Sequence, residues 1–185
     1  MLHTLSARWA QMETVLAAIF AALVTLMVLV NVLTRAMDQS IFWIDEAAIY
    51  AMIWMAYLGA SATLHHRSGI AVTLLPDALS PAGKRRLTLL VDLVVAIFAG
   101  LMIWFCLRWY DPLGLIAAGF DAEAFQNDTF NFIYAEPTNT LGIRKIWVWL
   151  IPGIFALGTA LHAIANLHQS LTGGIHTTET EATGP

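Results

Sequence analysis

The chain has 185 residues, of which 58% are apolar and only 12% are charged, with 9 basic and 13 acidic side chains and a formal net charge of −4. A soluble domain carries about 25% charged residues, so this composition argues against a soluble enzyme. The scattered basic residues of an acidic chain argue against nucleic-acid binding. A single cysteine, Cys106, leaves no disulfide framework and no cysteine-based zinc site.

Long uncharged segments are the dominant feature of the sequence. Uncharged runs of roughly 18 or more residues match the thickness of about 30 Å of hydrocarbon, and only the third run contains a charge, Asp92, close to its start. In lipid only helices satisfy every backbone group within one segment. We therefore predict an all-α integral membrane protein with four transmembrane helices, which span about residues 14–34, 47–64, 87–107 and 146–167.

The segments between and after the spans have their own signatures. Residues 69–79 are too short for a span and too apolar for a free loop, which predicts a short amphipathic segment in the membrane interface between the second and third helices. Ser80 followed by Pro81 is typical of a helix N-terminus. We expect residues 1–172 to form one four-helix membrane domain and the polar residues 173–185 to be a disordered tail.

The distribution of charge predicts the orientation. With four spans, both termini lie on the same side as the connection between the second and third helices. That connection ends in the basic cluster Lys84, Arg85 and Arg86, directly beside the third span. Because basic residues close to span ends favour the cytoplasmic side, we expect both termini in the cytoplasm. The opposite side then carries a long aromatic-rich connection, residues 111–140, which we expect to be packed rather than disordered.

Charged side chains gather where the first span ends and the second begins. Arg35 ends the first span, and Asp45 and Glu46 open the second. An acid at a helix N-terminus is stabilised by the helix dipole, which is worth about 0.3–1 kcal/mol. The favoured interpretation is that one of the two acids pairs with Arg35 across the short connection and so locks the two helices together. Direct handling of an ion or substrate is the least favoured interpretation. The sequence does not decide which acid pairs.

One face of the second span carries larger side chains at helical spacing. Glu46, Tyr50 and Trp54 recur every four residues, and Gly59 adds a small residue farther along. Such a face suits a partner helix, since small residues allow close approach. Packing within the chain's own bundle explains the pattern equally well.

Two acids lie at the edges of spans. Glu13 opens the first span, near Arg8, and Asp92 lies near the start of the third span, close to the basic cluster 84–86. A structural role is the favoured interpretation, because functional membrane carboxylates are expected nearer the bilayer centre. Each acid could pair with these basic residues, and Asp92 could instead form a hydrogen bond inside the bundle. We find no combination of nucleophile, base and orienting group, and predict no catalytic, cofactor or metal site.

The stretch from Asn31 to Leu75 resembles the small membrane subunit of tripartite ATP-independent periplasmic (TRAP) transporters, the DctQ-like family. The matching features are an arginine ending the first span, a tryptophan and an acidic pair opening the second, a tryptophan within that helix, and a later Leu-Gly-Ala step. An aromatic-rich approach to a Pro-Gly step in the fourth span is also similar. In this sequence these features are Arg35, Trp43, Asp45, Glu46, Trp54, Leu58, Gly59, Ala60, Pro152 and Gly153.

The resemblance implies a role as well as a fold. Small subunits of this family assemble with a large membrane subunit that holds the substrate and sodium sites, and they enlarge its fixed scaffold. A periplasmic substrate-binding protein delivers the substrate, usually an organic acid anion. The resemblance thus implies sodium-coupled uptake across the bacterial inner membrane, with no cofactor. Membrane lipid is the further expected partner, and the substrate and the stoichiometry stay open.

Two other functions are compatible with a small four-span chain. An independent multidrug-type carrier would use Glu13 or Asp92 as its proton-coupling acid. A haem or quinone anchor of a respiratory complex would need facing ligands, such as His65 and His162. The first predicts transport by the chain alone, and the second predicts a visible absorption band.

Overall fold

The computed structural model describes residues 1–66 and 79–172 of the chain. In this part, the long helices are α1 (Leu2–Ala36), α2 (Phe42–His66), α4 (Pro81–Tyr110) and α8 (Ile151–Leu171), and the short ones are α5 (Pro112–Ala117), α6 (Ala122–Thr129) and α7 (Lys145–Val148). Four helical segments of the described residues are long and apolar enough to cross a membrane, which confirms the predicted all-α membrane fold. The expected interfacial segment at 69–79, apart from its last residue, and the expected tail at 173–185 fall outside the described residues.

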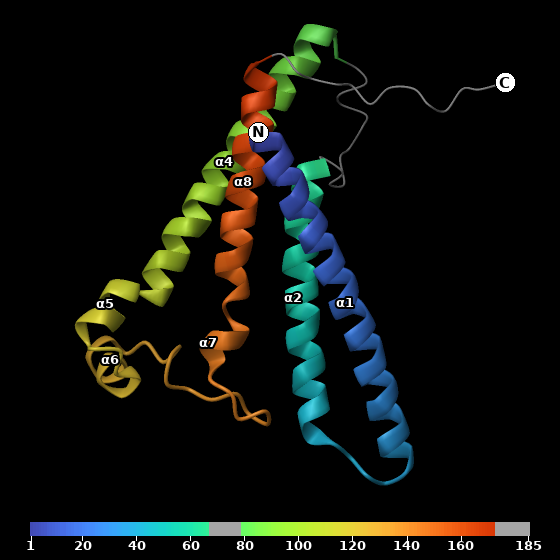
Figure 1. Cartoon of the computed structure of the whole chain (residues 1–185), viewed down its shortest axis with the longest axis vertical. Helices are drawn as coiled ribbons and strands as arrows, with labels where there is room; N and C mark the ends of the chain where they lie inside the picture. Colours follow the sequence, from blue (N-terminus) through green and yellow to red (C-terminus); the bar gives the residue numbers. More distant parts are fainter. Residues whose placement is uncertain (67–78, 173–185) are drawn as a thin grey trace, which may run out of the picture.

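The four long helices form two pairs. Helix α1 packs along α2, and α4 packs along α8, while α2 and the first turns of α1 both contact α8. Figure 1 shows that the pairs meet near the N-terminus and diverge toward the opposite end, where α5, α6 and the connection to α7 lie. We call this opposite end the outer end. The closest packing of the bundle is therefore at the end that holds the N-terminus.

The helices extend beyond the apolar runs that predicted them. Helix α1 begins at Leu2 rather than near residue 14, because its first turns pack as a helix against α8 through the buried residues Ser6, Ala10 and Glu13. Helix α4 begins at Pro81, and the Ser80 hydroxyl accepts a hydrogen bond from the Gly83 N–H at 3.3 Å. This arrangement confirms the predicted helix start.

The fourth span is divided rather than continuous. Helix α7 ends at Val148, and α8 begins at Ile151, with Pro152 in its first turn. Proline has no N–H to donate and is tolerated only at the beginning of a helix, so the break coincides with the proline that the sequence places inside this span. The Pro-Gly step is therefore a helix start at the outer end of the bundle.

Small and polar residues make up much of the interior of the bundle. The buried residues of α8 include Ala156, Gly158, Thr159, His162 and Asn166, whereas many large apolar side chains of α1 and α4 are exposed on the chain surface. Membrane helices are held together by close packing and hydrogen bonds rather than by burial of apolar surface away from water. The apolar surfaces of α1 and α4 thus remain available for lipid or a partner.

The outer connection is a folded unit. Asp111 ends α4 and also caps α5 by accepting from the Gly114 N–H at 3.1 Å. Phe125 of α6 is only 1% exposed and packs edge-to-face on Tyr134, whose hydroxyl donates to the Tyr110 carbonyl at 2.6 Å. The prediction that residues 111–140 are packed is confirmed.

Candidate functional site

The charged residues at the outer ends of α1 and α2 form a compact cluster. The Arg35 Nη2 lies 2.6 Å from Asp45 Oδ2. Asn31 lies between the two side chains: its amide nitrogen donates to Asp45, and its amide oxygen accepts from Arg35 Nε at 3.1 Å. Asp45 is thus the acid that pairs with Arg35, and Asn31 ties the pair to the body of α1.

The Arg35–Asp45 pair is expected to contribute little by itself. The two side chains are 59% and 46% exposed, and exposed ion pairs are worth about 0.2–1 kcal/mol. A double-mutant cycle with Arg35→Ala and Asp45→Ala, measured as the free energy of unfolding in detergent micelles, should give a coupling energy in this range. A coupling of several kcal/mol would contradict the exposed geometry. Asn31→Ala, which leaves the charges of Arg35 and Asp45 in place, is the matched control for these two substitutions.

Glu46 has a different role from its neighbour. Its carboxylate accepts hydrogen bonds from the backbone N–H groups of Asn139, Thr140 and Leu141 at 2.8, 2.6 and 2.9 Å, and from the Thr140 hydroxyl at 2.6 Å. Tyr50, one turn along α2, donates its hydroxyl to the same carboxylate at 3.0 Å. Glu46 therefore fastens the outer connection to the start of α2, with both oxygens engaged.

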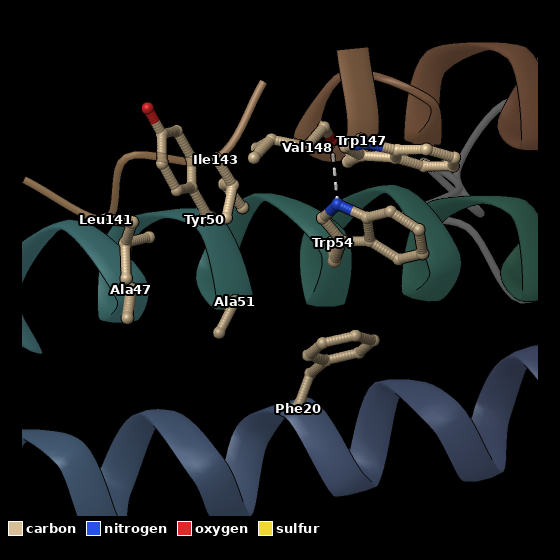
Figure 2. Close-up of a pocket in the computed structure, with 9 residues that line it drawn as sticks. All are labelled: Phe20, Ala47, Tyr50, Ala51, Trp54, Leu141, Ile143, Trp147 and Val148. Carbon is tan, nitrogen blue, oxygen red and sulfur yellow. Dashed lines mark hydrogen bonds between the residues drawn. The ribbon is translucent and has the colours of Figure 1, made fainter. Parts of the chain in front are cut away.

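The face of α2 that follows Glu46 packs against the start of the fourth span. The Trp54 indole N–H donates to the Val148 carbonyl at 2.8 Å, and its ring lies 5.6 Å from that of Phe20 on α1. Figure 2 shows that Trp54 lies between Phe20 and the α7 segment that carries Trp147. These side chains border an apolar hollow of about 280 Å³, whose lining is completed by Ala47, Tyr50, Ala51, Leu141 and Ile143. Glu46, Tyr50 and Trp54 all contact other parts of this chain.

The helix break at Pro152 is stabilised by Tyr110 at the end of α4. The Tyr110 hydroxyl donates to the Trp149 carbonyl at 2.6 Å and accepts from the Gly153 N–H at 3.1 Å. A Cβ on residue 153 would lie 3.1 Å from the Tyr110 ring, so glycine allows this close approach. The Pro152–Gly153 step thus joins α4 to α8 at the outer end.

Trp43 and Gly59 are less engaged within the chain. Trp43, at the start of α2, is 50% exposed. A Cβ on Gly59 would meet no atom of the described chain within 4 Å. These two predicted site residues therefore leave room for contacts with another molecule.

A buried polar cluster near the N-terminus was missed by the sequence analysis. Glu13 and His162 are both fully buried, with His162 Nε2 3.0 Å from Glu13 Oε2. Trp9 Nε1 donates to Glu13 Oε1 at 2.8 Å. The expected pairing of Glu13 with Arg8 is wrong: the carboxylate points into the bundle, whereas Arg8 is exposed. The signal present in the sequence was the helical spacing of Ser6, Ala10 and Glu13, which places them on one face of α1.

The cluster also includes His65 from α2. The Ser6 hydroxyl lies 2.7 Å from Nδ1 of both His65 and His162, whose ring centroids are 5.5 Å apart. The two imidazoles that a haem anchor would need thus share one serine hydroxyl. Among residues 1–66 and 79–172, no group of three or more His, Cys, Asp or Glu side chains is placed to hold a metal ion.

Asp92 lies in the interface between α4 and α8. It is 6% exposed and accepts a hydrogen bond from the Ser170 hydroxyl at 2.5 Å. This contact adds to the packing of the second helix pair at the end that holds the N-terminus, which fits the structural interpretation of this acid.

Comparison with known proteins identifies the family. Residues 24–173 match the family described as tripartite ATP-independent periplasmic transporters, DctQ component. This match covers most of the chain and includes the Arg35–Asp45 cluster, Glu46, Trp54 and the Pro152–Gly153 break. The chain belongs to the DctQ component family. Members of this family are transporter components rather than enzymes, and the four apolar helices agree with a multi-pass protein of the inner membrane.

One curated relative of this DctQ component comes from Haemophilus influenzae and is named "Putative TRAP transporter small permease protein". It is 31% identical over 83 residues, which are 44% of this chain and 52% of the relative. The chain thus spans about half the length of that relative. No solved structure matches the chain.

Proposed function

We propose that this DctQ component is the small scaffold subunit of a TRAP-type secondary transporter. In this role it assembles with the large membrane subunit and a periplasmic substrate-binding protein for sodium-coupled uptake of an organic acid anion. Family membership supports the transporter assignment. The sodium coupling and the substrate class come from the family resemblance, and they would be properties of the partner proteins.

The observation that supports the scaffold role is that charged residues form ion pairs and hydrogen bonds between different segments of this chain. Arg35 and Asp45 join α1 to α2, and Glu46 holds the connection at residues 139–141. Lys145, at the start of α7, pairs with Glu136 of the outer connection at 2.7 Å. A scaffold subunit that stays fixed while part of the large subunit moves against it needs such contacts between its own segments. Membrane carriers, in contrast, use ionisable groups near mid-membrane for their cargo.

We propose that the large subunit covers apolar surface of α1 and the positions that the fold leaves open. Hydrophobic side chains such as Leu26, Leu29 and Leu33 of α1 are more than half exposed. Trp43 and Gly59 of α2 supply an aromatic and a small residue for helix packing. The remaining exposed apolar surface would face membrane lipid.

The proposal places both termini and the end of α2 in the cytoplasm, with residues 1–172 as the membrane domain. Arg85 and Arg86 are exposed near the start of α4, and α4 starts at the same end of the bundle as the N-terminus (Figure 1). Basic residues at span ends favour the cytoplasmic side. The outer end would then face the periplasm.

We further propose that the folded outer connection contacts the substrate-binding protein. Phe120 and Phe130 are 72% and 81% exposed. Each has a positive φ (62° and 57°), a conformation that is unusual for bulky residues. Exposed acids lie close to them in the sequence: Asp121, Glu123 and Asp128. A segment with exposed aromatic and acidic side chains suits a partner surface with basic residues.

The decisive experiment compares the chain alone with the assembled transporter. Co-expressed with the large subunit, the tagged chain should retain it through purification, and vesicles containing both should accumulate substrate when the binding protein is supplied. Vesicles containing the chain alone should accumulate none. Accumulation by the chain alone would refute the scaffold role and favour an independent carrier. A visible absorption band in the purified chain would favour a cofactor anchor.

A further inference from the structure

Four side chains from three helices form a continuous hydrogen-bonded chain near the N-terminus. It runs from His65 on α2 to Ser6 on α1, then to His162 on α8, and ends at Glu13 on α1. The contacts are 2.7, 2.7 and 3.0 Å long. Ser6, Glu13 and His162 are fully buried, and His65 is partly exposed. This series of hydrogen bonds thus connects the buried Glu13 carboxylate to the protein surface.

The order Ser6, His162, Glu13 superficially matches a nucleophile–base–acid triad. The serine is fully buried, however, and its hydroxyl also contacts His65. A nucleophile needs an open side from which a substrate can approach. His162 and Glu13 therefore form the hydrogen-bonded base–acid pair of a triad, but Ser6 is not accessible to a substrate.

The positions of the hydrogens follow from the contacts. With Glu13 ionised, His162 must donate through Nε2, so a neutral His162 accepts at Nδ1 from the Ser6 hydroxyl. The Ser6 oxygen then accepts from Nδ1–H of His65. Because a hydroxyl has one hydrogen and an imidazole ring donates from one nitrogen when neutral, this is the one neutral-histidine pattern that satisfies all three contacts.

The same contacts also accommodate one extra proton. When a proton binds at Nε2 of His65, the Nδ1 hydrogen of His65 passes to Ser6 Oγ. The Ser6 hydrogen passes to Nδ1 of His162, and the Nε2 hydrogen of His162 passes to Glu13 Oε2. Every hydrogen bond is then reversed and none is lost, while the net charge of the four groups changes from −1 to 0. The Trp9 indole N–H donates to the other carboxylate oxygen, Glu13 Oε1, which takes no part in this transfer.

We propose that Glu13 is a reversible proton-binding site that exchanges protons with the surface through His162, Ser6 and His65. Burying an ionised carboxylate beside a neutral partner carries a large desolvation cost, so binding a proton there relieves that cost without moving a helix. Among the described residues, those that act electrostatically on His65 are His162 from α8, His66 from α2 and both His3 and Glu13 from α1. The rings of His3 and His66 lie 5.1 and 5.0 Å from the His65 ring, and neither ring is part of the hydrogen-bonded relay.

The test is infrared difference spectroscopy on the full-length chain in lipid nanodiscs, while the pH is lowered through the range in which carboxyl and imidazole groups titrate. The carbonyl stretch of a protonated carboxyl group should appear in the wild type. It should vanish in Glu13→Gln, change frequency in Glu13→Asp and stay unchanged in His66→Gln, which alters a neighbouring ring outside the relay. Glu13→Asp keeps a carboxyl group, so it decides the assignment even if Glu13→Gln folds poorly.

A pH-jump measurement tests the path. In Ser6→Ala the band should rise more slowly by about tenfold or more, because one link of the relay is missing; Ser6→Cys, which keeps a transferable hydrogen, should restore part of the rate. A band that persists in Glu13→Gln, no protonated carboxyl over the whole titration, or an equal rate in Ser6→Ala would each overturn the proposal. Glu13 would then serve only to hold the helices together.

Discussion

Replacing Gly158 with alanine is expected to destabilise the folded chain by about 1–3 kcal/mol, as in other overpacked interiors. An added Cβ would lie 2.5 Å from Glu13 Oε1, 2.7 Å from Ser61 Oγ and 2.8 Å from Trp9 Nε1. These side chains, two from α1 and one from α2, would have to shift, which disturbs the 3.0 Å contact between Glu13 and His162. The measurement is the free energy of unfolding in mixed detergent micelles.

Gly100→Ala on α4 is the matched control for this substitution. A Cβ at residue 100 meets nothing within 4 Å in the described chain. Alanine is the better helix former by about 0.8–1 kcal/mol, so the control should be neutral or slightly more stable. If Gly158→Ala were as stable as Gly100→Ala, the close contact of α1 with α8 would not be a determinant of the fold.

Replacing Glu46 with alanine is expected to release the outer connection from α2. The substitution removes the acceptor for three backbone N–H groups and for the Thr140 hydroxyl. Amide hydrogen exchange at residues 139–141 should then accelerate to the rate of an unprotected loop. The rest of α2 should keep its protection, because its other packing contacts, such as Trp54 with Val148, are unchanged. Mass spectrometry of the exchanged chain measures both effects.

Glu136→Ala is the matched control for Glu46→Ala. It removes a carboxylate from the same connection and breaks the 2.7 Å pair with Lys145, but it leaves the acceptor of the amides at 139–141 in place. Exchange that is unchanged in Glu46→Ala, or equally fast in both variants, would contradict the anchoring role. If the chain acts as the proposed scaffold subunit, Glu46→Ala should also weaken docking of the substrate-binding protein. The large subunit should still co-purify with the variant.

Several features of the fold could be predicted from the sequence because they depend on neighbouring residues alone. The number of spans follows from the length of the uncharged runs, and the start of α4 follows from Ser80 and Pro81. The proximity of Arg35 to the acidic pair follows from the short connection between α1 and α2. These properties are set by chain length, hydropathy and local capping, which need no knowledge of how helices are arranged.

The pairing of polar groups was decided only by the tertiary structure. Asp45 and Glu46 are adjacent and chemically similar, yet one meets Arg35 and the other meets residues 139–141, more than 90 positions away. Ser6 and His162 are 156 positions apart and share a hydrogen bond because α1 crosses α8. The sequence by itself determined which segments lie in the membrane, since apolar length is a local property. The order and rotation of the helices decided which polar or charged side chain meets which partner, because a turn of about 100° per residue moves a side chain from lipid to the interior.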